Sequence, residues 1–226
     1  TTFSCSHIEP FRPVKKDILA AKKVDALLNR LFIEPLLGLG YPVEDIGFLQ
    51  RIEKFVRQND EMDLAFKMDF IGLQNYTREM VKNATFIPFM GAKIVKASER
   101  NVETTLMNWE VFPESVYYIL KKFSAYENMP PLMITENGAA FSDEVKNNRV
   151  VDPKRLIYLK DNIDQVLRAK KEGVNVTGYF VWTFLDNFEW AEGYYPRFGL
   201  VYVDFETQKR IVKSSGNWYS AFLSQV

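Results

Sequence analysis

Apolar residues recur every three to four positions through the first part of the chain, a spacing that is typical of helices. The pattern predicts a short strand at residues 1–6 and one amphipathic helix through residues 14–31, which the Leu-Gly-Tyr-Pro segment at 39–42 ends. A second helical pattern covers residues 46–56. The apolar run at 68–76 then predicts a buried strand.

The second half of the chain alternates between helix and strand patterns after a stretch at 77–108 that is expected to be irregular. Asp152-Pro153 indicates a helix start, because Asp accepts the free N–H bonds of a first turn and Pro has no N–H to satisfy. That helix is expected to end at Gly173 as a C′ glycine. The other elements predicted here are a helix at 114–126, a strand at 132–135, a strand at 176–183, a hairpin at 199–213 and a helix at 217–223.

This order of strands and helices predicts an α/β fold in which helices cover a parallel sheet. The length of 226 residues is close to the roughly 250 of a complete (β/α)8 TIM barrel. Only four strands carry the alternation, so we expect half of such a barrel, made of its strands 5 to 8. No internal repeat, low-complexity tract or linker divides the sequence, and residues 1–226 are expected to form a single domain.

A half-barrel has two edge strands, here near Thr2 and near Phe180, with unpaired backbone N–H and C=O groups. Its inward side chains, for which Phe70, Leu73, Met133 and Phe180 are candidates, also lose the opposite wall of the core. We therefore expect the chain either to lie against a missing N-terminal half or to pair with a second copy of itself.

Composition narrows the class of partner. The 29 Lys and Arg residues balance the 29 Asp and Glu residues, so no overall field favours nucleic acid or an anionic membrane, and a neutral partner is expected. No apolar run reaches the roughly 18 residues that span a bilayer, and the N-terminus has no signal-peptide pattern. Cys5 is the only cysteine, and a cytoplasmic location is the default expectation.

A carboxylate follows the third strand of the alternation, in Ile134-Thr135-Glu136-Asn137-Gly138. In barrels the active site is built at the carboxyl ends of the parallel strands. A lone Glu at a strand end is nevertheless more often solvated or salt-bridged than catalytic, so this segment alone does not define a function.

Several spaced segments together carry a resemblance to a known family. The run GYFVWTFLDNFEW at 178–190, with 195–204 after it, closely resembles the strand 8 signature of family 1 glycoside hydrolases. Residues 134–138 resemble the nucleophile motif of that family, and 69–76 and 108–114 are similar to further family segments, all in the family's order. The resemblance covers essentially the whole chain. It implies a β-glucosidase-type retaining glycosidase that hydrolyses the O-glycosyl bonds of β-glucosides.

The resemblance implies two catalytic residues. Retaining glycosidases hold two carboxyl groups about 5–5.5 Å apart, one of which attacks the anomeric carbon while the other protonates the leaving oxygen. Glu136 matches the attacking nucleophile, and Tyr76 matches the tyrosine that hydrogen-bonds and orients it. The family has Asn and Tyr where this chain has Gln74 and Asn75, so the substrate contact expected of Gln74 departs from the common pattern.

Sugar sites combine flat aromatic rings with fixed hydrogen-bonding groups. By the resemblance, Trp182 lies beneath the ring at the cleavage site, Glu189 binds the outer hydroxyls, and Trp190 donates its indole N–H beside it. Phe198 borders the hydroxymethyl end, and Trp109 forms an aromatic platform on the leaving-group side. The alternative is that these aromatic residues belong to an ordinary core.

The same resemblance shows what this chain lacks. The family uses no metal and no other cofactor, and Glu189-Trp190 argues against a sugar-phosphate substrate, so a β-glucoside or oligosaccharide is expected. The acid/base of the family follows strand 4 in an Asn-Glu-Pro motif, which does not occur here. Glu9 and Glu34 both precede a Pro but lack the Asn. Glu9 is expected in the loop after strand 5, and Glu34 at a helix end.

Two functions therefore remain open. The chain is either the part of a glycosidase that supplies the nucleophile, or a catalytically inactive half-barrel or self-associating module with at most weak sugar binding. In both cases the chain alone is expected to be inactive or severely impaired, because each carboxylate serves in both steps of the reaction. The preference among glucose, galactose and fucose is also open.

Overall fold

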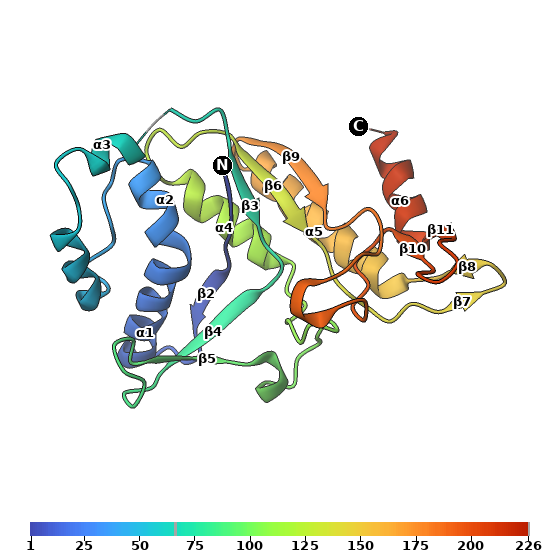
Figure 1. Cartoon of the computed structure of the whole chain (residues 1–226), viewed down its shortest axis with the longest axis horizontal. Coiled ribbons are helices and arrows are strands. Elements are labelled where there is room, and N and C mark those ends of the chain that lie inside the picture. Colours follow the sequence, from blue (N-terminus) through green and yellow to red (C-terminus); the bar gives the residue numbers. More distant parts are fainter. Residues whose placement is uncertain (66, 226) are drawn as a thin grey trace.

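Four parallel strands form the main sheet of the computed structural model, which describes residues 1–65 and 67–225 (Figure 1). The order across the sheet is β1 (Thr2–Ser4), β3 (Ile71–Gln74), β6 (Leu132–Asn137) and β9 (Val176–Val181). Strands that follow one another in the main alternation are therefore neighbours in space, and β1 and β9 are the two edges, as the sequence predicts.

Helices cover one face of this sheet (Figure 1). The helices that pack against it are α2 (Leu31–Leu36), α4 (Glu114–Ser124) and α5 (Pro153–Lys171). Helix α2 continues α1 (Lys15–Asp25) through a π-helical turn (Ala26–Arg30), and α6 (Ser214–Leu223) packs against α5. The main core lies between sheet and helices, where Leu73 and Ile134 pack with Ile119 of α4 and Val166 of α5. Gly173, with φ +92°, ends α5 as predicted.

The prediction that Leu73 faces the barrel interior is wrong, because its side chain is fully buried in the core beneath the helices. Side chains alternate between the two faces of a strand, so the neighbours of Leu73 lie on the inner face. There Thr2 and Thr135 hydrogen-bond at 2.7 Å, and a side chain at Gly178 would contact Met133. Phe180, two residues after Gly178, is 55% exposed on this face.

A second, three-stranded sheet lies beyond the carboxyl ends of β1 and β3. It consists of β2 (His7–Pro10), β4 (Arg78–Asn83) and β5 (Ala92–Val95), and α1 packs against it through Ala20 and Val24. The prediction of an irregular stretch at 77–108 is therefore wrong, and Glu9 lies in strand β2 instead of a loop.

Other elements differ from expectation in detail. The helix predicted at 46–56 is a 3₁₀ helix (Gly47–Lys54), and a short α3 (Asp60–Leu64) follows it. Asp152 makes no capping hydrogen bond at the start of α5. The predicted hairpin is confirmed as β10 (Val201–Val203) paired with β11 (Arg210–Val212). The remaining elements are short, namely β7 (Val145–Lys146), β8 (Arg149–Val150) and 3₁₀ turns at Ala97–Glu99 and Trp190–Glu192.

Asp152 instead belongs to a buried ionic network that ties the last part of the chain together. Lys213 donates to Asp143 at 2.5 Å and to Asp186 at 2.8 Å, and Arg155 pairs with Asp143 at 2.8 Å and with Asp152 at 2.6 Å. All five side chains are at most 1% exposed. Burial lowers the pKa of Lys213, while the two carboxylates oppose that shift.

Replacing Lys213 with methionine is expected to lower the free energy of unfolding by about 3–5 kcal/mol, because it removes the cation that Asp143 and Asp186 share and leaves each buried carboxylate with a single arginine. Urea unfolding followed by circular dichroism measures the change. Lys209→Met, at an exposed position in the β10–β11 turn, is the matched control and is expected to leave the midpoint unchanged. Equal midpoints for the two variants would show that the network contributes little to stability.

Candidate active site

Glu136 lies near the carboxyl end of β6, where its neighbour across the sheet is Gln74 of β3. Tyr76 donates its hydroxyl hydrogen bond to Oε2 of Glu136 at 2.5 Å, and Gln74 donates from Nε2 to Oε1 at 2.8 Å. Burial, followed by the hydrogen bond to Glu136, raises the pKa of Tyr76, so its hydroxyl stays protonated and remains a donor. Both oxygens of the Glu136 carboxylate are thus held by neutral donors.

A buried hydrogen-bond network fixes the backbone beneath this carboxylate. Asn137 donates from Nδ2 to the carbonyl oxygen of Asn75 at 2.7 Å, and it accepts from the Tyr179 hydroxyl at 2.6 Å. Tyr158 of α5 donates to the carbonyl oxygen of Tyr76 at 2.9 Å. The network joins β6, β9 and α5 to the segment that carries Tyr76. The sequence does not identify Tyr158 and Tyr179 as residues of the site, because their hydrogen-bond partners are distant in the chain.

Gly138 allows the chain after Glu136 to lie directly against the end of β9. A Cβ atom at this position would lie 1.7 Å from the carbonyl oxygen of Trp182, a backbone atom that no rotamer change can move. Only glycine fits such a close approach. The residue therefore sets the distance between the strand that carries Glu136 and the segment that carries Trp182.

Three aromatic rings form one wall next to Glu136. The centroid of Tyr76 lies 5.1 Å from that of Trp109 and 6.3 Å from that of Phe198, and the rings of Trp109 and Phe198 are 6.1 Å apart. Phe198 is 3% exposed, so it packs as a support behind the wall. Trp109 keeps partial exposure and presents a ring surface that a ligand can reach.

Glu189 lies close enough to Glu136 and Tyr76 for their charges to interact. Partial burial raises the pKa of Glu189, a hydrogen bond with Trp182 opposes the shift, and the charge of Glu136 adds to it. The same end of the sheet therefore holds Glu136, Tyr76, Gln74 and Glu189.

Trp190 does not join this group. Its side chain is 84% exposed on the 3₁₀ turn after Glu189. The structure thus brings together every residue singled out from the sequence for the site except Trp190.

The two Glu-Pro pairs of the sequence make structural contacts. Glu9 accepts from Arg78 at 3.2 Å and pairs with His7 at 2.8 Å. Glu34 is buried in α2 and accepts from Arg30 at 2.6 Å and from the Tyr126 hydroxyl at 2.8 Å. Neither has a free carboxylate near Glu136.

Within residues 1–65 and 67–225, no group of three or more His, Cys, Asp or Glu side chains is arranged to hold a metal ion. Over the same residues, no helix has the length and apolar character needed to cross a bilayer.

The comparison with protein families decides the assignment. The sequence model of Glycosyl hydrolase family 1 matches residues 1–226, the whole chain. The chain belongs to glycosyl hydrolase family 1. Beta-glucosidase A of Thermotoga maritima is 45% identical over 220 residues, which are 96% of this chain and 48% of that relative.

Solved structures of the family agree with the fold. The AHE enzyme from Alicyclobacillus herbarius superposes with a TM-score of 0.93 at 40% identity, and a family 1 β-glucosidase from Thermotoga maritima with 0.89 at 42%. Each match covers 99% of this chain and 50% of the solved chain. The family 1 chain thus spans about half the length of the relatives it matches. The predicted α/β fold with half of a (β/α)8 barrel is confirmed.

Proposed function

We propose that this chain is the nucleophile-bearing half of a retaining β-glucosidase-type hydrolase, with Glu136 as the nucleophile. The observation that carries the proposal is the position of its carboxylate, which is held through both oxygens by Tyr76 and Gln74 at the carboxyl end of a barrel strand. Hydrogen bonds to the two oxygens fix the direction of the carboxylate and so prepare it for attack on one carbon atom.

In the proposed reaction, an oxygen of Glu136 forms a bond to the anomeric carbon as the bond from that carbon to the leaving oxygen breaks. A carboxylic acid outside this chain protonates the leaving oxygen, and as a carboxylate it then removes a proton from water. That water displaces Glu136 and releases the sugar with its original anomeric configuration. Glu136 ends as the free carboxylate, so one turnover consumes one water molecule.

Residues beside Glu136 fit the binding of one sugar ring. We assign the outer hydroxyls to Glu189, the ring face to Trp182 and the leaving group to Trp109. Gln74 donates a hydrogen bond to Glu136, so we assign it mainly to orienting the nucleophile and secondarily to contacting the substrate. Phe198 supports Tyr76 and Trp109 from behind. Trp190 is included only if its turn closes over a bound sugar.

The proposal requires a partner for the inner face of the sheet. Relatives named as β-glucosidases are about twice as long as this chain, so we propose a first half-barrel as the partner that supplies the acid/base. A second copy of the chain is the alternative partner, and such a pair would have two nucleophiles and no acid/base. The substrate class that we propose is a β-glucoside or a β-linked oligosaccharide.

Covalent labelling tests the nucleophile. The chain is coexpressed with the first half of Beta-glucosidase A of Thermotoga maritima and treated with a 2-fluoro glucoside that carries an activated leaving group. Because the activated group leaves without acid catalysis, the sugar is expected to accumulate on Glu136, which peptide mass spectrometry identifies. A label on another residue, with Glu136 unmodified, would refute the assignment.

A further inference from the structure

The loop at residues 187–196 follows the last strand of the main sheet and carries Glu189. Most of its side chains are exposed, so the packing of the loop itself does little to hold it in place. Within the loop, Glu189 exchanges backbone hydrogen bonds with Gly193 at 2.8 and 3.0 Å. The position of Glu189 relative to the sheet therefore depends on how the two ends of the loop are fixed.

An ion pair between Asp186 and Arg197 closes this loop. Nη1 of Arg197 donates to Oδ2 of Asp186 at 2.7 Å, so the residues directly before and after the loop are joined. The same nitrogen donates to the carbonyl oxygen of Val203 in β10 at 2.9 Å. The Asp186 side chain is completely buried, and water screens such a pair much less than a pair at the surface. The pair therefore holds both ends of the loop against β10.

Arg197 is itself held by aromatic rings and by helix α5. Its guanidinium lies over the ring of Tyr202 at 4.1 Å and over the ring of Phe205 at 4.8 Å. Phe205 in turn packs against Tyr194 of the loop, with ring centroids 4.4 Å apart. Arg155 of α5 donates to the carbonyl oxygen of Arg197 at 2.7 Å. Both the side chain and the backbone of Arg197 are thus fixed.

Arg155 also connects Arg197 to the segment that follows Glu136. It donates to the carbonyl oxygens of Ala139 at 3.3 Å and of Phe141 at 3.4 Å, and its side chain is buried. One side chain therefore contacts both the segment after the proposed nucleophile and the residue that closes the loop of Glu189. These contacts fix the two carboxylates relative to one another.

We propose that Arg197 is a positioning residue for sugar binding, which closes the loop at 187–196 and so holds Glu189 at the distance from Glu136 that one sugar ring requires. The inference rests on the proposed function and extends it, because it makes the affinity for the outer hydroxyls depend on a residue that acts through Glu189. The ion pair of Arg197 with Asp186 is then a determinant of specificity as well as of stability.

Proteolysis of the purified 226-residue chain tests the closure of the loop. Asp186 keeps Lys213 at 2.8 Å when Arg197 is replaced, so Arg197→Met is expected to fold, which circular dichroism checks. Chymotrypsin is expected to cleave this variant about tenfold faster after the exposed aromatic residues of the loop, because the loop opens more often. Arg197→Lys keeps the charge without the flat guanidinium and is expected to fall between the two. Arg210→Met, at an exposed position of β11, is the matched control and is expected to be cleaved like the unaltered chain.

Titration calorimetry tests the effect on sugar binding in the chain assembled with the first half of Beta-glucosidase A of Thermotoga maritima. Arg197→Met is expected to weaken the binding of deoxynojirimycin, a glucose analogue, about tenfold. In a chain that already carries Glu189→Ala, the same substitution is expected to change binding by less than about twofold, because Arg197 then has no carboxylate to position. A merely structural effect of Arg197 would weaken binding equally in both backgrounds.

Three results would overturn the proposal. They are equal cleavage of the loop in Arg197→Met and Arg210→Met, equal weakening of deoxynojirimycin binding with Glu189 present or replaced, and absence of deoxynojirimycin binding to the assembled protein. Failure of the Glu136 labelling, with Arg197 and Glu189 still coupled in binding, would count against the proposed reaction alone. Successful labelling without that coupling would count against the role of Arg197 alone.

Discussion

Replacing Glu136 with alanine is expected to lower the rate of β-glucoside hydrolysis by on the order of 10⁴-fold or more in the protein assembled with a complementary half. The expectation follows from the proposed covalent step, in which no other group near the anomeric carbon can take the place of the carboxylate. Tyr76 and Gln74 both donate hydrogen bonds to this carboxylate, so the loss of activity is expected to be specific to the removal of Glu136. Hydrolysis of an activated aryl glucoside measures it.

Azide separates a lost nucleophile from a lost fold. In Glu136→Ala the space left by the carboxylate admits the anion, whose attack is expected to restore consumption of the activated glucoside and to give a glycosyl azide of inverted configuration. Glu192→Ala, at an exposed position on the turn after Glu189, is the control and is expected to retain full activity. Full activity in Glu136→Ala would contradict the nucleophile assignment.

The main sheet was predictable from the sequence because its strands are short apolar runs bounded by turn residues. Ile71, Leu73, Leu132 and Ile134 are almost completely buried against the helices, so they stand out as a continuous apolar signal. The direction of Leu73 was not predictable in the same way. A strand of a closed barrel is apolar on both faces, so the sequence does not tell which residues face inward.

The β4–β5 hairpin was missed because it has one packed face. Val81 of β4 packs against α1 and is fully buried. The other side chains of the strand are half-buried and several are charged, so no alternation of apolar and polar residues extends over it. The helix at Gly47–Lys54 was predicted from the sequence, but its 3₁₀ type was not. Leu49, Ile52 and Phe55 are three residues apart, which fits the 3₁₀ period as well as an α-helical face.

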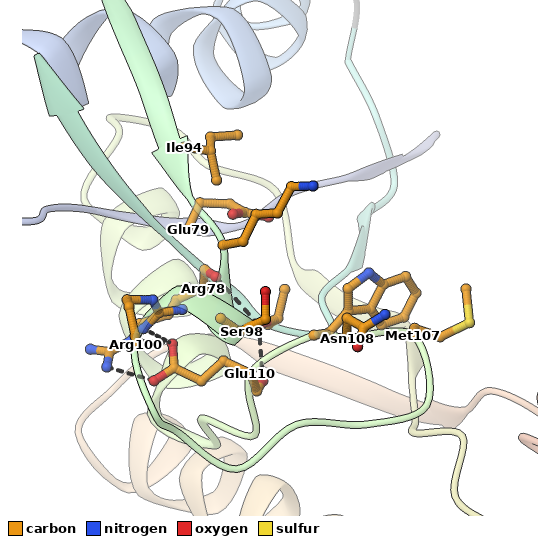
Figure 2. A pocket seen from close by; sticks show the side chains of 12 residues that line it. Arg78, Glu79, Ile94, Ser98, Arg100, Met107, Asn108 and Glu110 are labelled. Carbon is orange, nitrogen blue, oxygen red and sulfur yellow. Dashed lines mark hydrogen bonds and ion pairs between the residues drawn. The ribbon is translucent and has the colours of Figure 1, made fainter. Parts of the chain in front are cut away.

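Most of the candidate site was predictable because it lies in contiguous motifs at strand ends. The bond from Gln74 to Glu136 was not, since its position in the sequence suggested a contact with substrate. The cavity of about 460 Å³ that Arg78, Lys96 and Trp109 line (Figure 2) was also not predictable, because it depends on the missed hairpin and joins residues from three separate segments.

The inner face and the two edge strands of the main sheet determine how the chain assembles. β1 and β9 are edges without neighbours among the described residues, and each offers a row of backbone groups for pairing. Phe180, Phe184 and Phe188 are 55%, 69% and 58% exposed, all on β9 or the segment after it. At roughly 25 cal/mol per Å², several hundred Å² of such apolar surface in water costs on the order of 10 kcal/mol, which equals the stability of a typical domain.

The isolated chain of 26.3 kDa is therefore expected to form a dimer or larger assembly at micromolar concentration, and to bind a first half-barrel in preference when one is supplied. Size-exclusion chromatography with light scattering measures both. Phe180→Glu is expected to weaken each association, because it places a charge on the face that must be covered. Phe55→Glu, at a position 80% exposed on a different part of the molecule, is expected to change neither. A cooperatively folding monomer that ignores the first half would show that the inner face is stable in water, and would remove the partner on which the proposed reaction depends.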